Sequence, residues 1–266
     1  MTTVHEIYRY LDGLAPFRRQ MEFDNSGFLV GRGETEVRKV LVALDITGEV
    51  AHEAAVLGAQ MVVSHHPVIF RPRRSITDDD LVGRILLTLA ENRIAAVCAH
   101  TNLDVAVGGV NDALAQTLEL EDVTHFEVLG HDPDGAAYSV GRIGNASGPR
   151  TGSLADFAAF VKERLGTGGV RCVDAGLPVH RVAVGGGACG EYVEKAAALG
   201  CDTFVTSDMK YNQFLDAKAL GLNVIDAGHF STENVVCPVL AAWLRKGFPD
   251  LEVVQSACHR EVFSYL

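Results

Sequence analysis

The chain has 266 residues and a formal net charge of −11, with 48% hydrophobic and 21% charged residues. This length suffices for one large domain or two small ones with a real core, and the composition is ordinary for a globular enzyme. The acidic balance argues against nucleic acid as a partner, because a phosphate backbone is bound by bulk positive charge, whereas a small anionic ligand needs only a local basic cluster.

The six cysteines show no CxxC spacing, and several lie inside apolar runs. This usage predicts reduced, buried thiols in a cytoplasmic protein rather than a disulfide framework or a zinc knuckle. The N-terminus has no charged-then-apolar signal pattern, and no apolar run is long enough to span a bilayer. We therefore expect a cytoplasmic location and no membrane partner.

Short β-branched strands alternate with alanine-rich amphipathic helices along most of the chain. In the first half the predicted order, strand and helix in turn, is 40–45, 49–58, 61–64, 80–92, 94–99 and 110–120. After a less regular middle the order resumes with 181–184, 191–199, 203–206, 211–220, 224–227 and 234–246, and a last strand follows at 252–255. This alternation predicts an α/β fold with largely parallel sheets.

Three segments share one layout of helix end, Leu-Gly, apolar strand and polar exit: AAVLGAQMVVSHH, AAALGCDTFVTSD and AKALGLNVIDAGH. The glycine is the expected helix C-cap. The layout either is generic to helix–strand units or marks a duplicated lobe. A boundary is expected near Gly130–Gly135, and a second loop at 144–153 contains Ser153, a candidate N-cap. We therefore expect an N-terminal α/β lobe over residues 1–128 and a C-terminal α/β lobe over 129–266, with the last strand returning to the first lobe.

Histidines and carboxylates gather where three predicted strands end. Two adjacent histidines follow the strand at 61–64, HTNLD follows the strand at 94–99, and GHFSTE follows the strand at 224–227. The side chains concerned are His65, His66, His100, Asp104, His229 and Glu233. Because ligands bind beyond the carboxyl ends of strands in open parallel sheets, we expect these side chains to share a cleft.

Imidazole and carboxylate without thiolate form the ligand set of zinc, iron or manganese centres. Five such ligands exceed the needs of one tetrahedral ion and suit two ions that lower the pKa of a water between them. The predicted metal ligands are His65, His66, Asp104, His229 and Glu233. His100 is the predicted proton carrier in catalysis, with a role behind a ligand, or no role, as the alternatives. The histidines interpreted as having no site role are His5, His52, His125, His131, His180 and His259.

Four segments, SHHPVIF, HTNLDVAVGGVND, TSDMKY and DAGHFSTE, resemble in this order the NIF-three-like dinuclear-metal family, whose bacterial members are often labelled GTP cyclohydrolase I type 2. MEFDNSGFLVG is similar to the N-terminal motif of that family, with Phe23 where tryptophan is usual. The resemblance covers nearly the whole chain. It implies two similar three-layer α/β lobes with a metal site between them, and two divalent ions per subunit.

The resemblance also implies a role for each ligand. His65 and His66 would bind different ions, Asp104 one ion, His229 the other, and Glu233 would bridge them. A homohexamer is implied as well. The function implied is that of a dinuclear-metal-dependent hydrolase of a nucleotide or phosphorylated small molecule, similar to GTP cyclohydrolase I type 2; the alternative is a non-catalytic metal-binding or regulatory protein of the same family.

Three further features carry open interpretations. The run Arg71–Ser75 either holds a phosphate group of the substrate or is a solvated loop. Asp208 is a candidate acceptor behind a metal ligand. Gly185, Gly187 and Gly190 fit GxGxxG, which indicates either a dinucleotide site or a tight strand-to-helix turn; we favour the turn.

Overall fold

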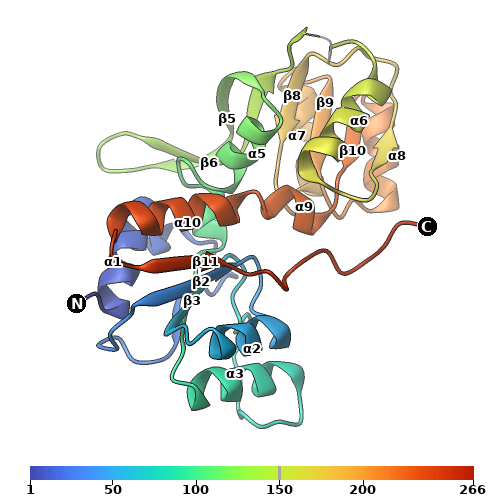
Figure 1. The fold of residues 1–266 in the computed structure, drawn as a ribbon. Helices are drawn as coiled ribbons and strands as arrows, with labels where there is room; N and C mark the ends of the chain where they lie inside the picture. The colour runs from blue at the N-terminus through green and yellow to red at the C-terminus, as the bar shows by residue number, and fades with distance from the viewer. Residues whose placement is uncertain (149–150) are drawn as a thin grey trace. The chain divides into compact units, whose positions relative to one another are not determined.

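The computed structural model of the chain describes residues 1–148 and 151–266 and divides into two compact units (Figure 1). The first unit comprises Met1–Ala106 and Val236–Arg260, and the second comprises Val107–Val235 and Glu261–Leu266. These limits differ from the expected division at 128/129, which falls within a strand of the second unit, Glu121–His131. The segment Gly130–Gly135 is not a linker, because Gly130 and His131 end that strand and Asp132–Gly135 form the hairpin turn into the next one.

A five-stranded sheet in the order β1–β4–β3–β2–β11 forms the centre of the first unit (Figure 1). β4, β3, β2 and β11 pair in parallel, while β1 is antiparallel to β4. The last strand therefore joins the first sheet, as expected. The elements of this unit are α1 (Val4–Leu14), η1 (Phe17–Arg19), β1 (Gly27–Val30), β2 (Lys39–Ala43), α2 (Gly48–Val56), β3 (Met61–Ser64), α3 (Leu81–Glu91), β4 (Ala95–Cys98), α4 (Thr101–Asp104), α10 (Val236–Gly247) and β11 (Glu252–Gln255).

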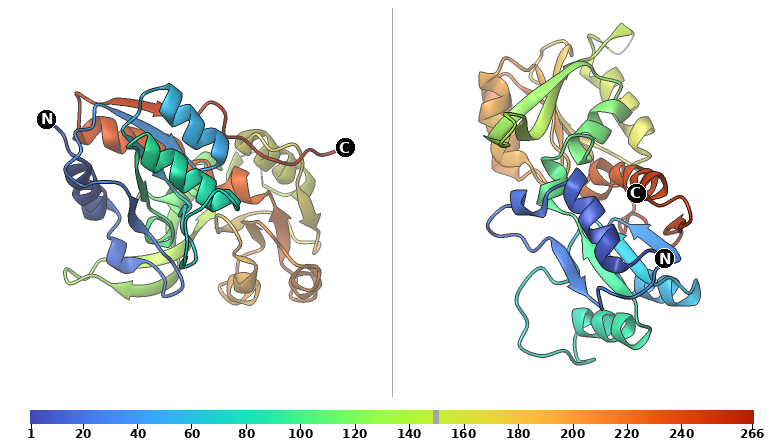
Figure 2. Two further views of the ribbon diagram at one scale, coloured as in Figure 1. Left: turned by 90° about the horizontal axis from the view of Figure 1, so that it is seen from below. Right: turned by 90° about the vertical axis from the view of Figure 1, so that its left-hand side faces the viewer.

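Helices cover both faces of this sheet. α2 and α3 lie side by side (Figure 2, left) and pack Val50 and Leu89 against Leu41 and Val62 of the strands. α1 and α10 cover the other face, where the Tyr10 hydroxyl donates a hydrogen bond to the Trp243 carbonyl. Because both faces are covered, β3 and β4 are buried along their whole length, which explains their uninterrupted apolar sequences.

The second unit is built on a six-stranded sheet in the order β5–β6–β8–β9–β10–β7. Its elements are α5 (Val110–Thr117), β5 (Glu121–His131), β6 (Ala137–Asn145), α6 (Leu154–Leu165), β7 (Arg171–Val173), β8 (Arg181–Val184), η3 (Gly190–Tyr192), α7 (Val193–Ala198), β9 (Thr203–Thr206), α8 (Tyr211–Ala219), β10 (Asn223–Asp226) and α9 (His229–Glu233). α5 and α6 pack Leu114 and Phe157 against Val182 and Val205 of the strands. α7 and α8 lie next to each other and contact β9 and β10.

The expectation of largely parallel sheets holds for the first unit only. In the second unit β8, β9 and β10 are parallel, but β5–β6, β6–β8 and β7–β10 pair antiparallel, so the sheet is mixed. β5 was not predicted because it is largely exposed and its sequence has no apolar run. β7 was not predicted because it is only three residues long. Ser153 caps α6 as predicted, accepting a hydrogen bond from the Asp156 amide; residues 149–150 of the loop that precedes it lie outside the described residues.

The three Leu-Gly segments have the same local structure. Gly58, Gly200 and Gly221 follow helices with φ of 66°, 72° and 73°, in the left-handed region that glycine enters without strain. In each case the next residue donates its amide back to a carbonyl five residues earlier, as in the Schellman motif. Each glycine therefore terminates its helix as expected, but it stands one residue beyond the C-cap, which is Leu57, Leu199 or Leu220.

The six cysteines are all free thiols, and Cys98, Cys189, Cys201 and Cys237 are buried. Among residues 1–148 and 151–266, no helix has both the length and the apolar sequence needed to cross a lipid bilayer.

Candidate metal centre

The two adjacent histidines lie just beyond the end of β3, in the first unit. The amides of His65 and His66 both donate to the carbonyl of Leu44, at 3.1 and 2.9 Å. This shared acceptor breaks the alternation that would point the two rings to opposite faces of a strand. The ring centroids are 4.9 Å apart. His65 is fully buried and the His66 side chain is 21% exposed, so the pair lies at the edge of the core.

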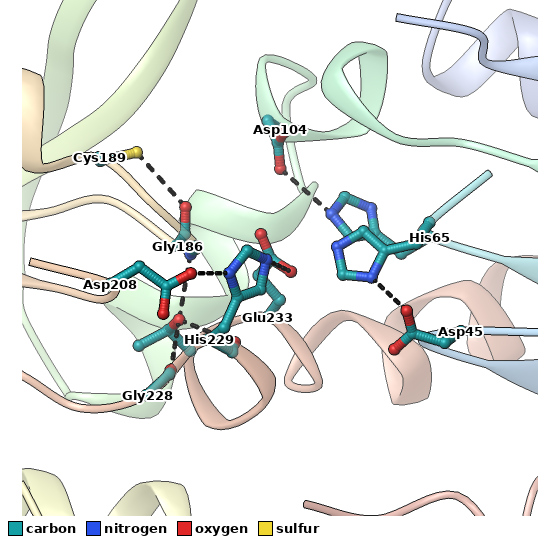
Figure 3. Close-up of polar contacts among 12 residues, drawn as sticks. Asp45, His65, Asp104, Gly186, Cys189, Asp208, Gly228, His229 and Glu233 are labelled. Atoms are coloured by element: carbon teal, nitrogen blue, oxygen red, sulfur yellow. Dashed lines mark hydrogen bonds and ion pairs between the residues drawn. The ribbon is translucent and has the colours of Figure 1, made fainter. Parts of the chain in front are cut away.

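A third imidazole reaches the same place from the end of β4. His100 precedes the short helix α4, and its ring centroid lies 5.1 Å from that of His65 and 5.3 Å from that of His66. One ring nitrogen from each of the three residues lies within 4.8 Å of the others. α4 also places Asp104, whose Oδ1 is 3.6 Å from Nε2 of His65 (Figure 3). The first unit therefore gathers three imidazoles and one carboxylate.

Hydrogen bonds fix which nitrogen of each ring can bind a metal. Nδ1 of His65 lies 2.8 Å from the carbonyl oxygen of Ala99. A carbonyl oxygen only accepts, so Nδ1 carries the proton and Nε2 of the neutral ring carries the lone pair. Nδ1 of His66 lies 2.8 Å from Oδ1 of Asp45, and Nδ1 of His100 lies 2.7 Å from Oδ1 of Asp24. In each of the three rings, Nδ1 therefore faces an oxygen atom, and Nε2 is the nitrogen that can bind a metal.

The two aspartates behind these rings are held as carboxylates. Burial alone would raise the pKa of Asp24, but hydrogen bonds from His100, Thr101 and Ser26 outweigh it and hold the pKa well below its usual range. Burial would likewise raise the pKa of Asp45, and hydrogen bonds from His259 and His66 lower it well below the usual range. Both side chains therefore act as permanent acceptors for imidazole N–H groups.

The second unit holds the remaining pair on α9. His229 and Glu233 begin and end this one-turn helix, and Nε2 of His229 lies 3.0 Å from Oε2 of Glu233. Nδ1 of His229 lies 2.8 Å from Oδ2 of Asp208, the acceptor suggested by the sequence (Figure 3). In this ring too, Nδ1 faces an oxygen atom and Nε2 is the nitrogen that can bind a metal, as in the first unit. The Glu233 side chain is 4% exposed, while that of His229 is 35% exposed.

The glycine-rich turn after β8 serves Glu233 and not a dinucleotide. A Cβ at Gly187 would lie 2.1 Å from Oε1 of Glu233, so only glycine leaves room for this carboxylate. The amides of Gly186 and Gly187 donate to Asn111 and to the Thr232 hydroxyl, both at 3.0 Å. Because these amides already have protein acceptors, they are not presented to a pyrophosphate, and the tight-turn interpretation of GxGxxG is the one that the geometry supports.

The donor distances suit divalent cations. Two ligand atoms that each bind one ion at about 2.1 Å lie roughly 3.0–3.4 Å apart for angles between 90° and tetrahedral. The His229–Glu233 separation of 3.0 Å falls at this limit, and the His65–Asp104 separation of 3.6 Å lies slightly beyond it. Neutral imidazoles with oxygen acceptors behind them, together with buried carboxylates, form a set that zinc, iron or manganese can occupy.

Sequence reasoning missed three residues of this arrangement. Asp24 lies within the segment MEFDNSG, whose resemblance to a family motif was the only signal for it. Asp45 follows β2 and gave no signal. His259 was interpreted as having no site role, yet its Nε2 lies 2.9 Å from Oδ2 of Asp45. The predicted arginine cluster is an exposed loop in which Arg73 forms an ion pair with Asp80.

Comparison with known proteins places this chain among relatives of its own length. A Clostridium perfringens protein named GTP cyclohydrolase 1 type 2 homolog is 30% identical over 265 residues, which covers 99% of both chains. A Streptomyces coelicolor protein of the same name is 36% identical over 248 residues, covering 92% of this chain and 86% of the relative.

Solved structures show the same relationship. The crystal structure of the Bacillus cereus protein related to NIF3 matches 100% of this chain and 99% of its own, with a TM-score of 0.93 and 27% identity. The sequence profile of the Duf34/NIF3 (NGG1p interacting factor 3) family matches residues 2–261. The resemblance carried by the strand-exit motifs is thus confirmed over nearly the whole sequence, and the chain belongs to the Duf34/NIF3 family.

Proposed function

We propose that this protein is a metal-dependent hydrolase of a nucleotide or another phosphorylated small molecule, and that side chains of both units hold two divalent ions. The observation that carries the proposal is the common arrangement of the three proposed imidazole ligands, His65, His66 and His229, in each of which an oxygen at Nδ1 makes Nε2 the nitrogen that can bind a metal. The proposed ligands are His65, His66, Asp104, His229 and Glu233.

The course of the chain supports a shared centre. Asp104 stands two residues before Ala106, where the chain leaves the first unit, and Glu233 stands two residues before Val235, where it leaves the second. A carboxylate therefore precedes each of these two crossings. When bound, a pair of divalent ions lowers the pKa of water and polarises the bond under attack. Glu233 is the proposed bridge, since its carboxylate is buried and confined by the glycine turn.

His100 is the proposed proton carrier. Its Nδ1–H is held by Asp24, a buried carboxylate that also accepts from the amide and hydroxyl of Thr101. This arrangement fixes the ring and favours protonation at Nε2, as an aspartate does for a general-base histidine. Nε2 of His100 can then accept a proton from the attacking water and return it to the leaving group.

The loop after the histidine pair supports an anionic substrate. A hollow of about 350 Å³ is lined mostly by residues of the loop that follows His66 in sequence, among them Phe70, Arg71 and Arg73. Phe70 packs edge-on against the His100 ring, with centroids 6.2 Å apart. Guanidinium groups beside an aromatic ring suit the phosphate and base of a nucleotide. Because both relatives are named GTP cyclohydrolase 1 type 2 homolog, GTP is the first nucleotide to test.

Metal content is the first measurement. Elemental analysis of freshly isolated protein should find two equivalents of divalent metal per chain, and chelation should remove them. His65→Gln and Glu233→Gln should each lose at least one equivalent, while His52→Gln, which alters an exposed histidine on α2, should keep both. A wild-type protein that binds no metal in titrations with zinc, manganese and ferrous iron would refute the proposal.

Turnover decides between a hydrolase and a non-catalytic metal-binding protein. The metal-loaded protein should consume at least one member of a panel of nucleotides and phosphorylated metabolites. Arg71→Ala should raise KM with little change in kcat if the loop binds phosphate, because it removes uniform binding. Stoichiometric metal without turnover on any substrate would leave the regulatory alternative and exclude hydrolysis.

A further inference from the structure

The C-terminal segment after β11 reaches the candidate metal centre through one side chain. Ser256 is anchored at the end of β2, where its amide donates to the Val42 carbonyl at 2.8 Å. Three residues later, His259 lies against Asp45, and its side chain is 8% exposed. Nε2 of His259 lies 2.9 Å from Oδ2 of Asp45 and 3.1 Å from the Asp45 amide nitrogen. One ring nitrogen cannot donate to the carboxylate and accept from the amide at once, and the shorter contact, to an ionised carboxylate, assigns the proton to Nε2. His259, which is remote in sequence from the strand-exit motifs, thus contacts Asp45, whose carboxylate is hydrogen-bonded to the proposed ligand His66.

Asp45 is held by one imidazole at each carboxylate oxygen. Oδ1 accepts the Nδ1 proton of His66, and Oδ2 accepts from Nε2 of His259. Two donors on opposite oxygens fix the plane of a carboxylate, whereas a single donor leaves it able to rotate. The orientation of the His66 ring, and with it the direction of the His66 lone pair, therefore depends on His259.

We propose that His259 is a positioning residue for His66, which it orients through Asp45. The inference rests on the proposed function, because it takes His66 to be a metal ligand. Outer partners of ligating histidines typically change metal affinity by about 10–100-fold when they are removed. The site that would lose affinity is the one occupied by the ion bound to His66.

A pair of variants that differ by one methylene tests this role. The side-chain amide of His259→Gln lies as many bonds from Cα as Nε2 of histidine and can donate to Asp45, whereas that of His259→Asn is one bond too short. Cys258→Ala serves as the control, because the Cys258 thiol contacts Glu53 and not Asp45. All variants are made in the full chain, and circular dichroism and melting temperature confirm that each is folded.

Cobalt(II) is the probe, since its visible absorption reports the geometry of its ligands. In titrations of the metal-free protein, His259→Asn should bind one of the two equivalents 10–100-fold more weakly and with an altered spectrum, while His259→Gln recovers most of the affinity. In an Asp45→Asn background, His259→Asn should cause no additional loss, because the effect passes through Asp45.

Other outcomes overturn the inference. Wild-type affinity and spectrum in His259→Asn would refute it while leaving the proposed function intact, provided that His66→Ala still loses metal. Equal losses in His259→Asn and Cys258→Ala would show that only docking of the segment matters. A wild-type protein that binds no cobalt would refute the proposed function and the positioning role together.

Discussion

Histidine can bind a metal through either ring nitrogen, and in this chain the choice is made by the oxygen atoms that face Nδ1 of each ring. Ala99 offers a carbonyl to His65, whereas Asp24, Asp45 and Asp208 offer carboxylates to the other three rings. A carbonyl behind His65 leaves the ligand nearly neutral, while a carboxylate makes the imidazole more basic and a stronger donor to a cation. The four rings therefore differ in donor strength although they share one orientation.

Replacing Gly187 with alanine should displace Glu233 and weaken metal binding. The new Cβ would lie 2.1 Å from the Glu233 carboxylate, and the residue would also occupy φ of 69°. Gly200→Ala separates these two effects, because Gly200 has φ of 72° with open space at its Cβ. Both variants should lose about 1–2 kcal/mol of unfolding free energy from the left-handed backbone. Only Gly187→Ala should lose metal affinity in a titration; equal affinities in the two variants would contradict this account.

Asp24→Asn should reduce both stability and turnover. The substitution replaces one acceptor oxygen of Asp24 with an amide NH₂ group, which cannot accept a hydrogen bond. At least one buried donor therefore loses its partner, at a cost of about 1–3 kcal/mol in the free energy of unfolding, measured with urea. If His100 moves a proton, kcat should fall further than stability explains. Ser26→Ala is the control, since it removes the Ser26 hydrogen bonds to Asp24 and to the His100 amide but leaves the contact between the His100 ring and Asp24 in place. A similar kcat in both folded variants would argue against proton transfer by His100.

At the scale of elements, the sequence was most informative where both faces of a strand are buried. Met61–Ser64, Arg181–Val184 and Thr203–Thr206 were predicted to the residue, because each is a short β-branched run bounded by turn signals. β5 was missed for the opposite reason, since a largely exposed strand carries no apolar pattern. β6 was missed although most of it is buried, because Ser139, Gly141, Arg142 and Gly144 interrupt its apolar residues. The ligand set could be predicted because strand ends deliver it, whereas Asp45 and His259 become neighbours only through tertiary packing.

The C-terminal segment is also fastened to α2, and this attachment should depend on pH. Burial alone would raise the pKa of Glu53, but hydrogen bonds from Ser256, Ala257 and Cys258 outweigh it and lower the pKa below its ordinary value of 4.5. A lowered folded-state pKa means that Glu53 stabilises the fold above about pH 4.5. That contribution is lost as the pH falls through the lower, folded-state value.

Glu53→Gln should therefore melt at a lower temperature than the wild type at pH 6–7, and the difference should shrink as the pH falls below 4.5. Circular dichroism melts between pH 3 and 7 provide the measurement. A difference that stays constant over this range would mean that ionisation of Glu53 does not hold the segment.

At the scale of the whole molecule, the chain passes between the two units at 106/107, 235/236 and 260/261. Asp104, Glu233 and His259 each stand within two residues of the last position before a crossing. An ion bound by ligands from both units would be released when either unit opens locally near these crossings. Its binding free energy would therefore oppose local opening in both units at once. Separate ions, each bound within one unit, would protect each unit independently.

Hydrogen–deuterium exchange distinguishes these cases. Metal added to the metal-free protein at about 100 times its Kd should slow exchange in α4 and α9 by up to about 100-fold, corresponding to roughly 2.7 kcal/mol, and should leave α3 unchanged. Glu233→Gln removes a ligand from the second unit only, and if Glu233 bridges the ions it should also diminish the metal-dependent protection of Thr101–Asp104 in the first. Full protection of α4 in Glu233→Gln would instead mean that the first unit binds its ion without help, and the shared centre would have to be replaced by two independent sites.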